Sequence, residues 1–423
     1  MARLLLQLPT IQNWSCHNCS GCCRQHAIEV TPDEQQRILD QKWSPETGVP
    51  ADQPLFETTS GWLRSKTVRL AHQSDGGCVF LQGDGLCRIH ARFEESAKPL
   101  ACRVYPYALH PAGRKITVSL RYSCPSVVAN KGRPVSEQRG ELKKIAAFVV
   151  PRGAARTPPP SVLPGQQVEW PDFLRFVEHL DLSFEDSSVP FNVRLLRTLF
   201  WVNLVGQSRF DSVVGQRLEE FLELIAQAAR EEVPEQLPDD VTPTRAGFLQ
   251  FRTLVGQYAR RDTSVDSAGG VLVRWKLFRN GLRFARGRGD IPAVQECFRE
   301  VPFAALEGSF GALPSEADEI LARYVRVKIQ GIHFCGPAYY NVPLVEGFRA
   351  LALIVPAIFW IARWLAVSDQ RSSLTTEDIV RAVTIADHHH GYSPAFGTAA
   401  FRRRVRLLAT TNDIDRLVMH YAK

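Results

Sequence analysis

The sequence predicts the α+β fold class, with a small, irregular cysteine-cluster domain followed by a mostly α-helical domain. Three observations lead to this prediction. Eight of the ten cysteines lie before residue 125, helical periodicity dominates after residue 170, and the segment between them reads "PRGAARTPPPSVLPGQQVEW". Prolines at this density cannot sustain a helix or a central strand. We therefore expect a cysteine-cluster domain over residues 1–150, a proline-rich linker over residues 151–170 and a mainly α-helical domain over residues 171–423.

Length and composition describe an ordinary globular chain. A length of 423 residues exceeds what one hydrophobic core usually supports, which favours two domains. With 45% hydrophobic and 22% charged residues, the chain is not expected to be disordered. The net charge of +7 is modest for this length, so a solvated basic surface is a better interpretation than a nucleic-acid face. We do not expect a nucleic-acid partner.

The location of the protein follows from its apolar segments. The start, "MARLLLQLPT", has only three consecutive leucines, which is too short for the apolar core of a signal peptide. The longest apolar run, Ala350–Ala362, contains Pro356 and is too short to cross a bilayer as a helix. We predict a buried helix there, no transmembrane segment and a cytoplasmic location; a helix lying in a membrane interface is the alternative. In a reducing compartment, clustered thiols favour metal binding over disulfides.

Local signals place several regular elements. Thr31, Pro32 and Glu34 form a capping box that predicts a helix start, and "RKITVSLRY" (residues 114–122) alternates apolar and polar residues as a half-buried strand does. In the second domain, "RLEEFLELIAQAAREE" and "FLQFRTLVGQYARR" carry apolar residues at helical spacing. "DHHH" (Asp387–His390) precedes Gly391, so we interpret it as the end of a helix rather than as a metal site.

The stretch "CHNCSGCC" carries the chemistry. Cys16, Cys19 and Cys22 form C-x2-C-x2-C, a spacing that lets a short loop wrap three sulfurs around one centre. A fourth ligand must come from elsewhere, and Cys124, followed by proline, has the local form of a remote ferredoxin ligand. Side chains of adjacent residues tend to diverge, so we expect Cys23 either to serve a second centre or not to be a ligand.

A second group of cysteines follows in "CVFLQGDGLCRIH" and "CRVYPY". Cys78 and Cys87 flank a Gly-Asp-Gly turn, which predicts a hairpin that brings their sulfurs together, and Cys102 comes next. Eight sulfurs could satisfy two tetrahedral zinc ions, or one four-iron cluster with several cysteines left over. Four histidines are possible substitutes: His17, His26, His90 and His110.

These stretches together resemble the YkgJ-type cysteine-cluster family, described as a zinc- or iron-chelating domain with a CxxCxxCC signature. The resemblance covers roughly the first 125 residues; the segment "ARFEESAKPLACR" is longer than the family's usual "RP" step before its last "CR". The two-part layout, and "LTTEDIVRAVTIADHHH" near the end, are similar to FliB-type flagellin lysine-N-methylases. The resemblance implies an iron–sulfur cluster, of the [4Fe-4S] type, or zinc as cofactor. It implies as metal ligands Cys16, Cys19, Cys22, Cys23, Cys78, Cys87, Cys102 and Cys124.

Two functional classes remain. In the first, the metal centre is catalytic and the helical domain presents a protein substrate, as in a protein lysine N-methyltransferase. In the second, the metal is structural and the helical domain is a non-catalytic protein-interaction module. No glycine-rich unit for S-adenosylmethionine is evident, because "DSAGGVL" (Asp266–Leu272) follows no strand. Catalytic residues and oligomeric state are left open.

Overall fold

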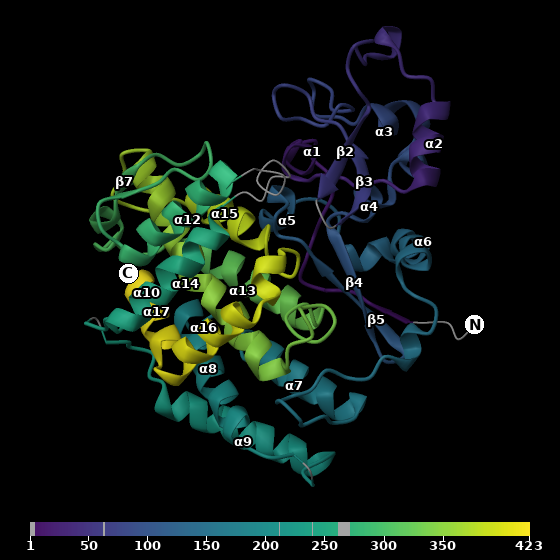
Figure 1. The fold of residues 1–423 in the computed structure, drawn as a ribbon. Coiled ribbons are helices and arrows are strands. Elements are labelled where there is room, and N and C mark those ends of the chain that lie inside the picture. Colours follow the sequence, from purple (N-terminus) through teal and green to yellow (C-terminus); the bar gives the residue numbers. More distant parts are fainter. Residues whose placement is uncertain (1–4, 62–63, 211, 239, 261–270) are drawn as a thin grey trace.

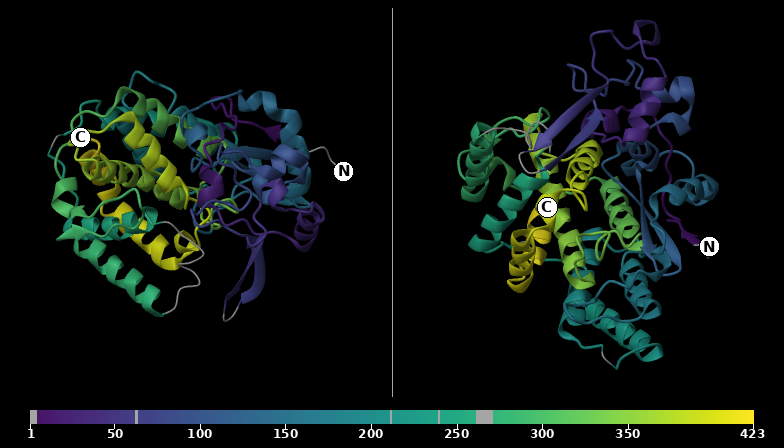
Figure 2. Two further views of the ribbon diagram at one scale, coloured as in Figure 1. Left: turned by 90° about the horizontal axis from the view of Figure 1, so that it is seen from above. Right: turned by 45° about the vertical axis from the view of Figure 1, so that its right-hand side comes forward.

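The computed structural model describes residues 5–423 apart from residues 62–63, 211, 239 and 261–270. The glycine pair of the Asp266–Leu272 segment lies outside these residues. Short strands and helices make up the N-terminal part, and helices fill the rest, so the α+β prediction is confirmed. Figures 1 and 2 show the N-terminal part on one side of the molecule and the packed helices on the other.

The N-terminal part consists of short elements. Its helices are α1 (Gly21–Gln25), α2 (Pro32–Asp40), α3 (Arg88–Phe93), α4 (Leu100–Val104), α5 (Pro125–Val128) and α6 (Arg139–Val149). Its strands are β1 (Leu5–Gln7), β2 (Phe56–Gly61), β3 (Arg64–Leu70), β4 (Tyr107–Ala112) and β5 (Lys115–Leu120). The capping box predicted at Thr31 and Glu34 is present at the start of α2.

Strand β5 is the centre of a three-stranded sheet with the order β1-β5-β4. It pairs in parallel with β1 and antiparallel with β4. The strand was predicted correctly, but its half-buried character was not, because residues 116–120 are all buried. Helix α13 (Ser315–Gln330) packs against the second face, where Thr117 Oγ1 donates to Gly331 O at 3.0 Å and Ser119 Oγ to Val327 O at 3.3 Å. The polar positions therefore face a helix rather than water.

The C-terminal part is mainly helical, as predicted. Besides α13 and two short paired strands, β6 (Asp290–Ile291) and β7 (Val301–Pro302), its elements are α7 (Trp170–Leu182), α8 (Phe191–Gln207), α9 (Gln216–Glu232), α10 (Arg245–Tyr258), α12 (Val271–Arg286), α14 (Leu344–Ser368), α15 (Thr376–Asp387), α16 (Ala399–Thr410) and α17 (Asp413–Tyr421). The apolar faces predicted for α9 and α10 point inward.

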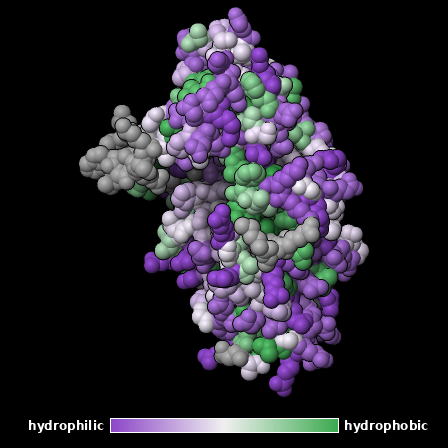
Figure 3. Space-filling model, turned by 90° about the vertical axis from the view of Figure 1, so that its right-hand side faces the viewer, coloured by the Kyte–Doolittle hydropathy of each residue, from purple (hydrophilic) through white to green (hydrophobic). Residues whose placement is uncertain are grey.

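Helix α14 is the core of the helical region. It is long and apolar enough to span a membrane, but 94% of its most apolar window is buried by the rest of the protein. It contacts α15, α17, α8 and α16, so its apolar surface is used for packing. The predicted buried helix is confirmed, and it extends through Pro356 well beyond the apolar run. In Figure 3, hydrophilic residues cover most of the face shown and hydrophobic ones gather near its middle.

Two hydrophobic cores divide the described residues. The smaller one lies between Val30 and Ile89 and packs β3 with the Cys78–Leu81 turn. The larger one runs from Leu6 through β4, β5 and α6 to the last helix, and it includes Val162 of the proline-rich segment. The N-terminal sheet thus shares its core with the helical region. The domain boundaries expected at residues 150 and 170 stay a prediction.

A buried ion pair fastens the N-terminal sheet to the helices. Lys328 Nζ lies 2.7 Å from Asp387 Oδ1, and both side chains are fully buried. Lys328 also donates to Leu120 O at 3.1 Å, while Asp387 accepts from Ser123 N at 3.0 Å and from the Tyr324 hydroxyl at 3.2 Å. Buried charges are tolerated only when paired and hydrogen-bonded in this way. The pair therefore fixes the C-terminal end of α15 against the chain that follows β5.

Replacing Lys328 with methionine is expected to lower the free energy of unfolding by about 3 kcal/mol or more, because the Asp387 carboxylate is left buried without its counter-ion. Adding Asp387→Asn removes that charge but keeps an acceptor, so the double variant should recover part of the loss. Urea unfolding measures both effects, with Lys143→Met on the exposed face of α6 as control. A double variant less stable than Lys328→Met alone would contradict this account.

Candidate metal centre

The "CHNCSGCC" stretch forms a tight loop followed by α1. Asn18 and Ser20 adopt positive φ angles of 54° and 55°, which bend the chain between Cys16 and Gly21. The loop is held at its base, where Ser15 N donates to Lys131 O at 3.0 Å. The backbone thus curls as a metal-binding loop does, and the adjacent Cys22 and Cys23 lie within α1.

Gly85 fixes a second loop against this one. It is the last glycine of the Gly-Asp-Gly turn and has a φ of +85°. A Cβ placed on it would lie only 2.1 Å from Asn18 O, so no other residue fits without moving one of the loops. Cys87 follows two residues later. The close approach of Gly85 to Asn18 therefore sets the position of Cys87 relative to the first cysteines.

Five cysteines make up what we call the inner cysteine group: Cys22, Cys23, Cys78, Cys87 and Cys102. The sulfurs of Cys22 and Cys23 are 3.9 Å apart, and Cys78 N donates to Cys23 O at 2.9 Å. The expected divergence of the two adjacent side chains is therefore wrong. Two thiolates on one tetrahedral zinc ion, with Zn–S of about 2.3 Å, are about 3.8 Å apart. The observed spacing of Cys22 and Cys23 matches that edge.

Electrostatics link the members of this group. Burial raises the pKa of the Cys78 thiol to about 12, and Cys87 and Cys22 add to the rise. Burial also raises the pKa of the Cys102 thiol, with further contributions from Cys78, Cys87 and Cys22. The contact with Cys23 raises the pKa of the Cys22 thiol, followed by burial. These thiols repel one another as thiolates, so a bound cation would stabilise the charged form and release protons.

The hairpin expected between Cys78 and Cys87 takes a different form. Cys87 is paired in the backbone with Leu81, and Cys78 with His72, so the two cysteines are not opposite each other in one ladder. The tight turn itself is present, with Gln82 N donating to Leu86 O at 2.9 Å. The backbone pairing around this turn stops at Leu81 and Cys87 and does not reach Cys78. The two cysteines remain neighbours because the chain doubles back at this turn.

The remaining predicted ligands lie outside the inner group. Cys19 Sγ would contact a Cβ on Gly21 at 3.7 Å, and Pro125 Cδ lies at the same distance from that point, so Cys19 is close to the Cys124–Pro125 corner. Burial raises the pKa of the Cys124 thiol, and Cys19 adds to the rise. Cys16 is exposed, and its thiol approaches Asn18 Oδ1 at 3.7 Å. The fourth-ligand role predicted for Cys124 is compatible with this placement and stays a prediction.

The residues fit a zinc or iron centre in their chemistry. Soft thiolates are the ligands that zinc and iron–sulfur clusters prefer, and all ten cysteines are free rather than paired as disulfides. Among the described residues, no three Cys, His, Asp or Glu side chains already stand at positions that could hold one ion. The inner group would therefore have to close by side-chain rotation when metal binds. The assignment of individual ligands stays a prediction.

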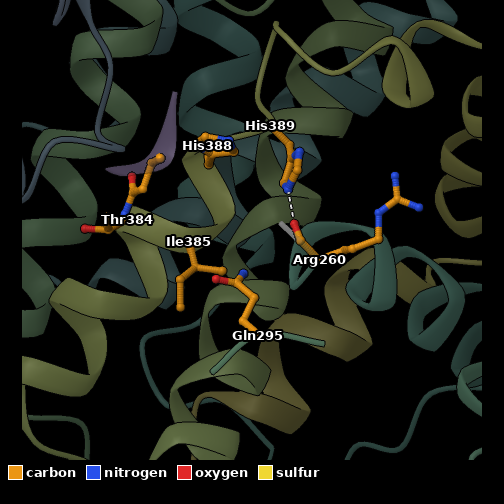
Figure 4. Close-up of a pocket in the computed structure, with 7 residues that line it drawn as sticks. Arg260, Gln295, Thr384, Ile385, His388 and His389 are labelled. Carbon is orange, nitrogen blue, oxygen red and sulfur yellow. Dashed lines mark hydrogen bonds between the residues drawn. The ribbon is translucent and has the colours of Figure 1, made fainter. Parts of the chain in front are cut away.

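A pocket lies where α1 meets the helical region. It has room for about 90 Å³ and is lined by Gln25, Arg260, Gln295, Thr384, Ile385, His388 and His389. Gln25 is only two residues after Cys23, while Thr384, Ile385 and His388 lie at the C-terminal end of α15. Figure 4 shows the Gln295 and Ile385 side chains beside each other and the guanidinium of Arg260 pointing away from them. We call this cavity the junction pocket.

The "DHHH" residues have separate partners. His388 stacks on His26, with ring centroids 5.0 Å apart. His389 Nε2 donates to Arg260 O, and His390 Nε2 donates to His333 O at 2.9 Å. They do not converge on one point, and α15 ends at Asp387. The interpretation as a helix end is therefore confirmed, although the same residues also hold the N-terminal part in place.

Comparison with known proteins supports a metal-binding role for the cysteine region. Residues 15–125, about a quarter of the chain, match the family CxxCxxCC, described as "Putative zinc- or iron-chelating domain". This match spans all eight candidate cysteines. No curated protein and no solved structure matches the chain. The match covers the metal-binding region alone and leaves the helical region unassigned.

Several residues that shape this region were not singled out from the sequence. Gln25 and Lys328 carry no motif, and the predicted Gly-Asp-Gly turn did not indicate the contact of Gly85 with Asn18. Lys328 had one local signal, because it lies between Val327 and Ile329 in the stretch "VRVKI" of a helix, where Arg326 is the other charge. The partners of Gly85 and Gln25 depend on tertiary contacts that spacing does not reveal.

Gly85→Ala is expected to lower the stability of the cysteine region by about 2 kcal/mol and to reduce bound metal, because alanine is strained at positive φ and its Cβ meets Asn18 O. Elemental analysis and thermal unfolding measure the two effects. Gly83→Ala is the matched control, since a Cβ there meets nothing within 4 Å. Equal metal content in both variants would refute the proposed contact.

Three buried or half-buried histidines, His110, His333 and His390, predict that the folded protein loses stability in acid. Burial lowers the pKa of His110 and of His390 to about 4 and lowers that of His333 well below its usual value. The unfolded chain takes up these protons near pH 6.5, whereas the folded chain does not until about pH 4. Stability should therefore fall as the pH drops through this window, by on the order of 1 kcal/mol per pH unit for each histidine.

Urea unfolding at about pH 7.5, 6.5 and 5.5 checks this prediction. His390→Gln should make the fall in stability with decreasing pH less steep, because one of the buried histidines that resist protonation is removed. Parallel slopes in the wild type and His390→Gln would count against the assignment.

Proposed function

We propose that the protein is a cytoplasmic, metal-dependent protein-modifying enzyme of the flagellin lysine-N-methylase-like kind. In this proposal the N-terminal cysteines hold an iron–sulfur cluster or zinc, and the helical region presents a lysine of a protein substrate. The family match supports zinc or iron binding. The metal ligands would come from Cys16, Cys19, Cys22, Cys23, Cys78, Cys87, Cys102 and Cys124.

The junction pocket is the observation that carries the proposal. It is lined by Gln25, two residues after Cys23, and by the end of α15, so a group bound there would lie near the cysteine region. Its volume of about 90 Å³ corresponds to about three water molecules, at roughly 30 Å³ each. Pockets for whole cofactors or drug-sized ligands are usually about 300 Å³ or larger. The junction pocket therefore suits the end of an extended side chain better than a nucleotide-sized molecule.

The lining of the pocket suits a neutral amine. Gln25 Oε1 is buried and finds no hydrogen-bond partner within the described part of the chain. An unpaired buried acceptor favours a ligand that donates a hydrogen bond. A lysine amine meets this requirement, and the described residues that line the pocket include no carboxylate that would hold it as an ammonium ion. The pocket thus favours the neutral, nucleophilic form of the side chain.

The chemical step would be methyl transfer to that amine. The lysine nitrogen forms a bond to a methyl carbon while the carbon–sulfur bond of a sulfonium donor breaks, and the amine loses one proton. A metal centre, when bound, would supply Lewis acidity or electron transfer close to the pocket. The chain itself would orient the amine through Gln25 and exclude water with the Ile385 side chain.

Anaerobic purification followed by metal and sulfide analysis, and by incubation with a sulfonium methyl donor and flagellin, tests the proposal. We expect iron with sulfide, or zinc, together with methyl-lysine detectable by mass spectrometry. Cys22→Ser and Cys102→Ser should lose bound metal, whereas Cys297→Ser, outside the cysteine region, should retain it. Ile385→Trp should fill the pocket and lower the methylation rate about tenfold or more with metal content unchanged.

The exposed substitution Leu407→Trp on α16 controls for the added indole. Stoichiometric zinc bound by four thiolates, with no methylation of flagellin, would instead favour the alternative of a structural metal and a protein-interaction module. Retained metal in both cysteine variants would reject the ligand assignment.

A further inference from the structure

Helix α12 exposes large apolar side chains on one face. Trp275, Phe278 and Leu282 are 61%, 56% and 40% exposed, and their spacing of three and four residues places them side by side. The rings of Trp275 and Phe278 stack, with centroids 5.6 Å apart. Large aromatic side chains normally contribute most to cores and interfaces. Two such rings and a leucine exposed side by side indicate a binding surface, which we call the α12 face.

The opposite side of α12 is anchored in the core. Phe284 is 2% exposed and lies edge-on to Phe303 at 5.9 Å between centroids, with Trp360 and Trp364 close by. Gly256 of α10 leaves room for it, since a Cβ on that glycine would be 2.8 Å from the Phe284 ring. The helix is therefore held firmly by its inner side. Trp275 and Phe278 are therefore exposed on a helix whose opposite side is already buried in the core.

The charged residues of α12 itself all have one sign. Lys276, Arg279, Arg283 and Arg286 lie on the helix, and no aspartate or glutamate occurs between residues 271 and 289. Lys276, Arg279 and Arg286 are exposed. A protein surface normally mixes both signs, so an unbroken basic helix implies an acidic partner. The partner must therefore combine negative charge with an apolar layer.

We propose that the α12 face docks the protein on an anionic lipid bilayer. Basic residues beside tryptophan, phenylalanine and leucine are typical of helices that lie in a membrane interface. Tryptophan in particular prefers the headgroup level. In both views of Figure 2 the green helix that follows the grey trace of residues 261–270 lies at the outer edge of the helical region, away from the N-terminus. Such a projecting helix can reach a flat surface.

The geometry sets the depth of docking. Because α12 stays packed on α10 and α14, the protein binds peripherally, with Trp275, Phe278 and Leu282 inserted and the basic residues at the phosphates. Each Lys or Arg near an anionic surface strengthens binding about fivefold, and this attraction weakens with salt. An acidic amphipathic protein segment has the same two chemical properties, and the test distinguishes it from lipid.

A vesicle flotation assay measures binding of the full-length, metal-loaded protein. The vesicles contain phosphatidylcholine alone or an approximately 7:3 mixture of phosphatidylcholine and phosphatidylglycerol. We expect binding to the anionic vesicles only, reduced by salt. Trp275→Ser/Phe278→Ser should lower the partition coefficient about tenfold or more, and Arg279→Gln/Arg283→Gln about fivefold for each charge. Leu224→Ser, which removes a 65% exposed leucine from α9, should leave it unchanged.

Circular dichroism and thermal unfolding establish that each variant is folded. If the Trp275→Ser/Phe278→Ser double variant does not fold, the Trp275→Ser single variant takes its place. Absence of binding to anionic vesicles, or equal binding by wild type and the folded α12 variants, overturns the proposal. Binding of a glutamate- and leucine-rich amphipathic peptide in place of vesicles, lost in the same variants, would assign the face to a protein partner and also overturn it.

Discussion

The carboxylate of Asp387 is the point on which the arrangement of the two halves depends. It accepts from Lys328 on α13, from the Tyr324 hydroxyl and from Ser123 N, the residue before Cys124. The next residue, His388, stacks on His26, three residues after Cys23. One helix end therefore holds both cysteine-bearing loops against the helical region. The junction pocket exists because α15 ends at this place, with Asp387 turned inward and His388 beside the pocket.

The elements that sequence reasoning predicted correctly are governed by local contacts. The capping box at Thr31 and Glu34 needs only residues three apart, and the apolar face of α9 needs only a regular period. Strand β5 was located by its alternation, but its polar residues Thr117 and Ser119 were expected in water. They are buried because α13, about two hundred residues later, covers that face. Burial on the second face of a sheet is a tertiary property that a strand pattern does not contain.

The cysteines show the same limit within one motif. Their spacing located the loop and the region that matches the chelating family, because tight loops follow from local sequence. Spacing assigned Cys22 with Cys16 and Cys19, a grouping that stays a prediction, but it did not show that Cys22 also lies near Cys23, Cys78 and Cys102. Cys22 and Cys23 lie in α1, and Cys78 N donates to Cys23 O, which brings the Cys78 turn next to this helix. Gly85 then brings Cys87 to the same side.

The junction pocket and the groove beside α12 share one residue. Arg260 at the end of α10 lines the junction pocket, and it also lines the groove of about 250 Å³ between α10 and α12. Its backbone carbonyl holds His389, while its guanidinium points away from the junction pocket. Arg260 therefore connects the junction pocket with the groove that separates α10 from α12. The junction pocket is small, so it favours a substrate side chain presented by a larger protein over a freely diffusing cofactor-sized molecule, because only the former can reach the pocket with its bulk outside.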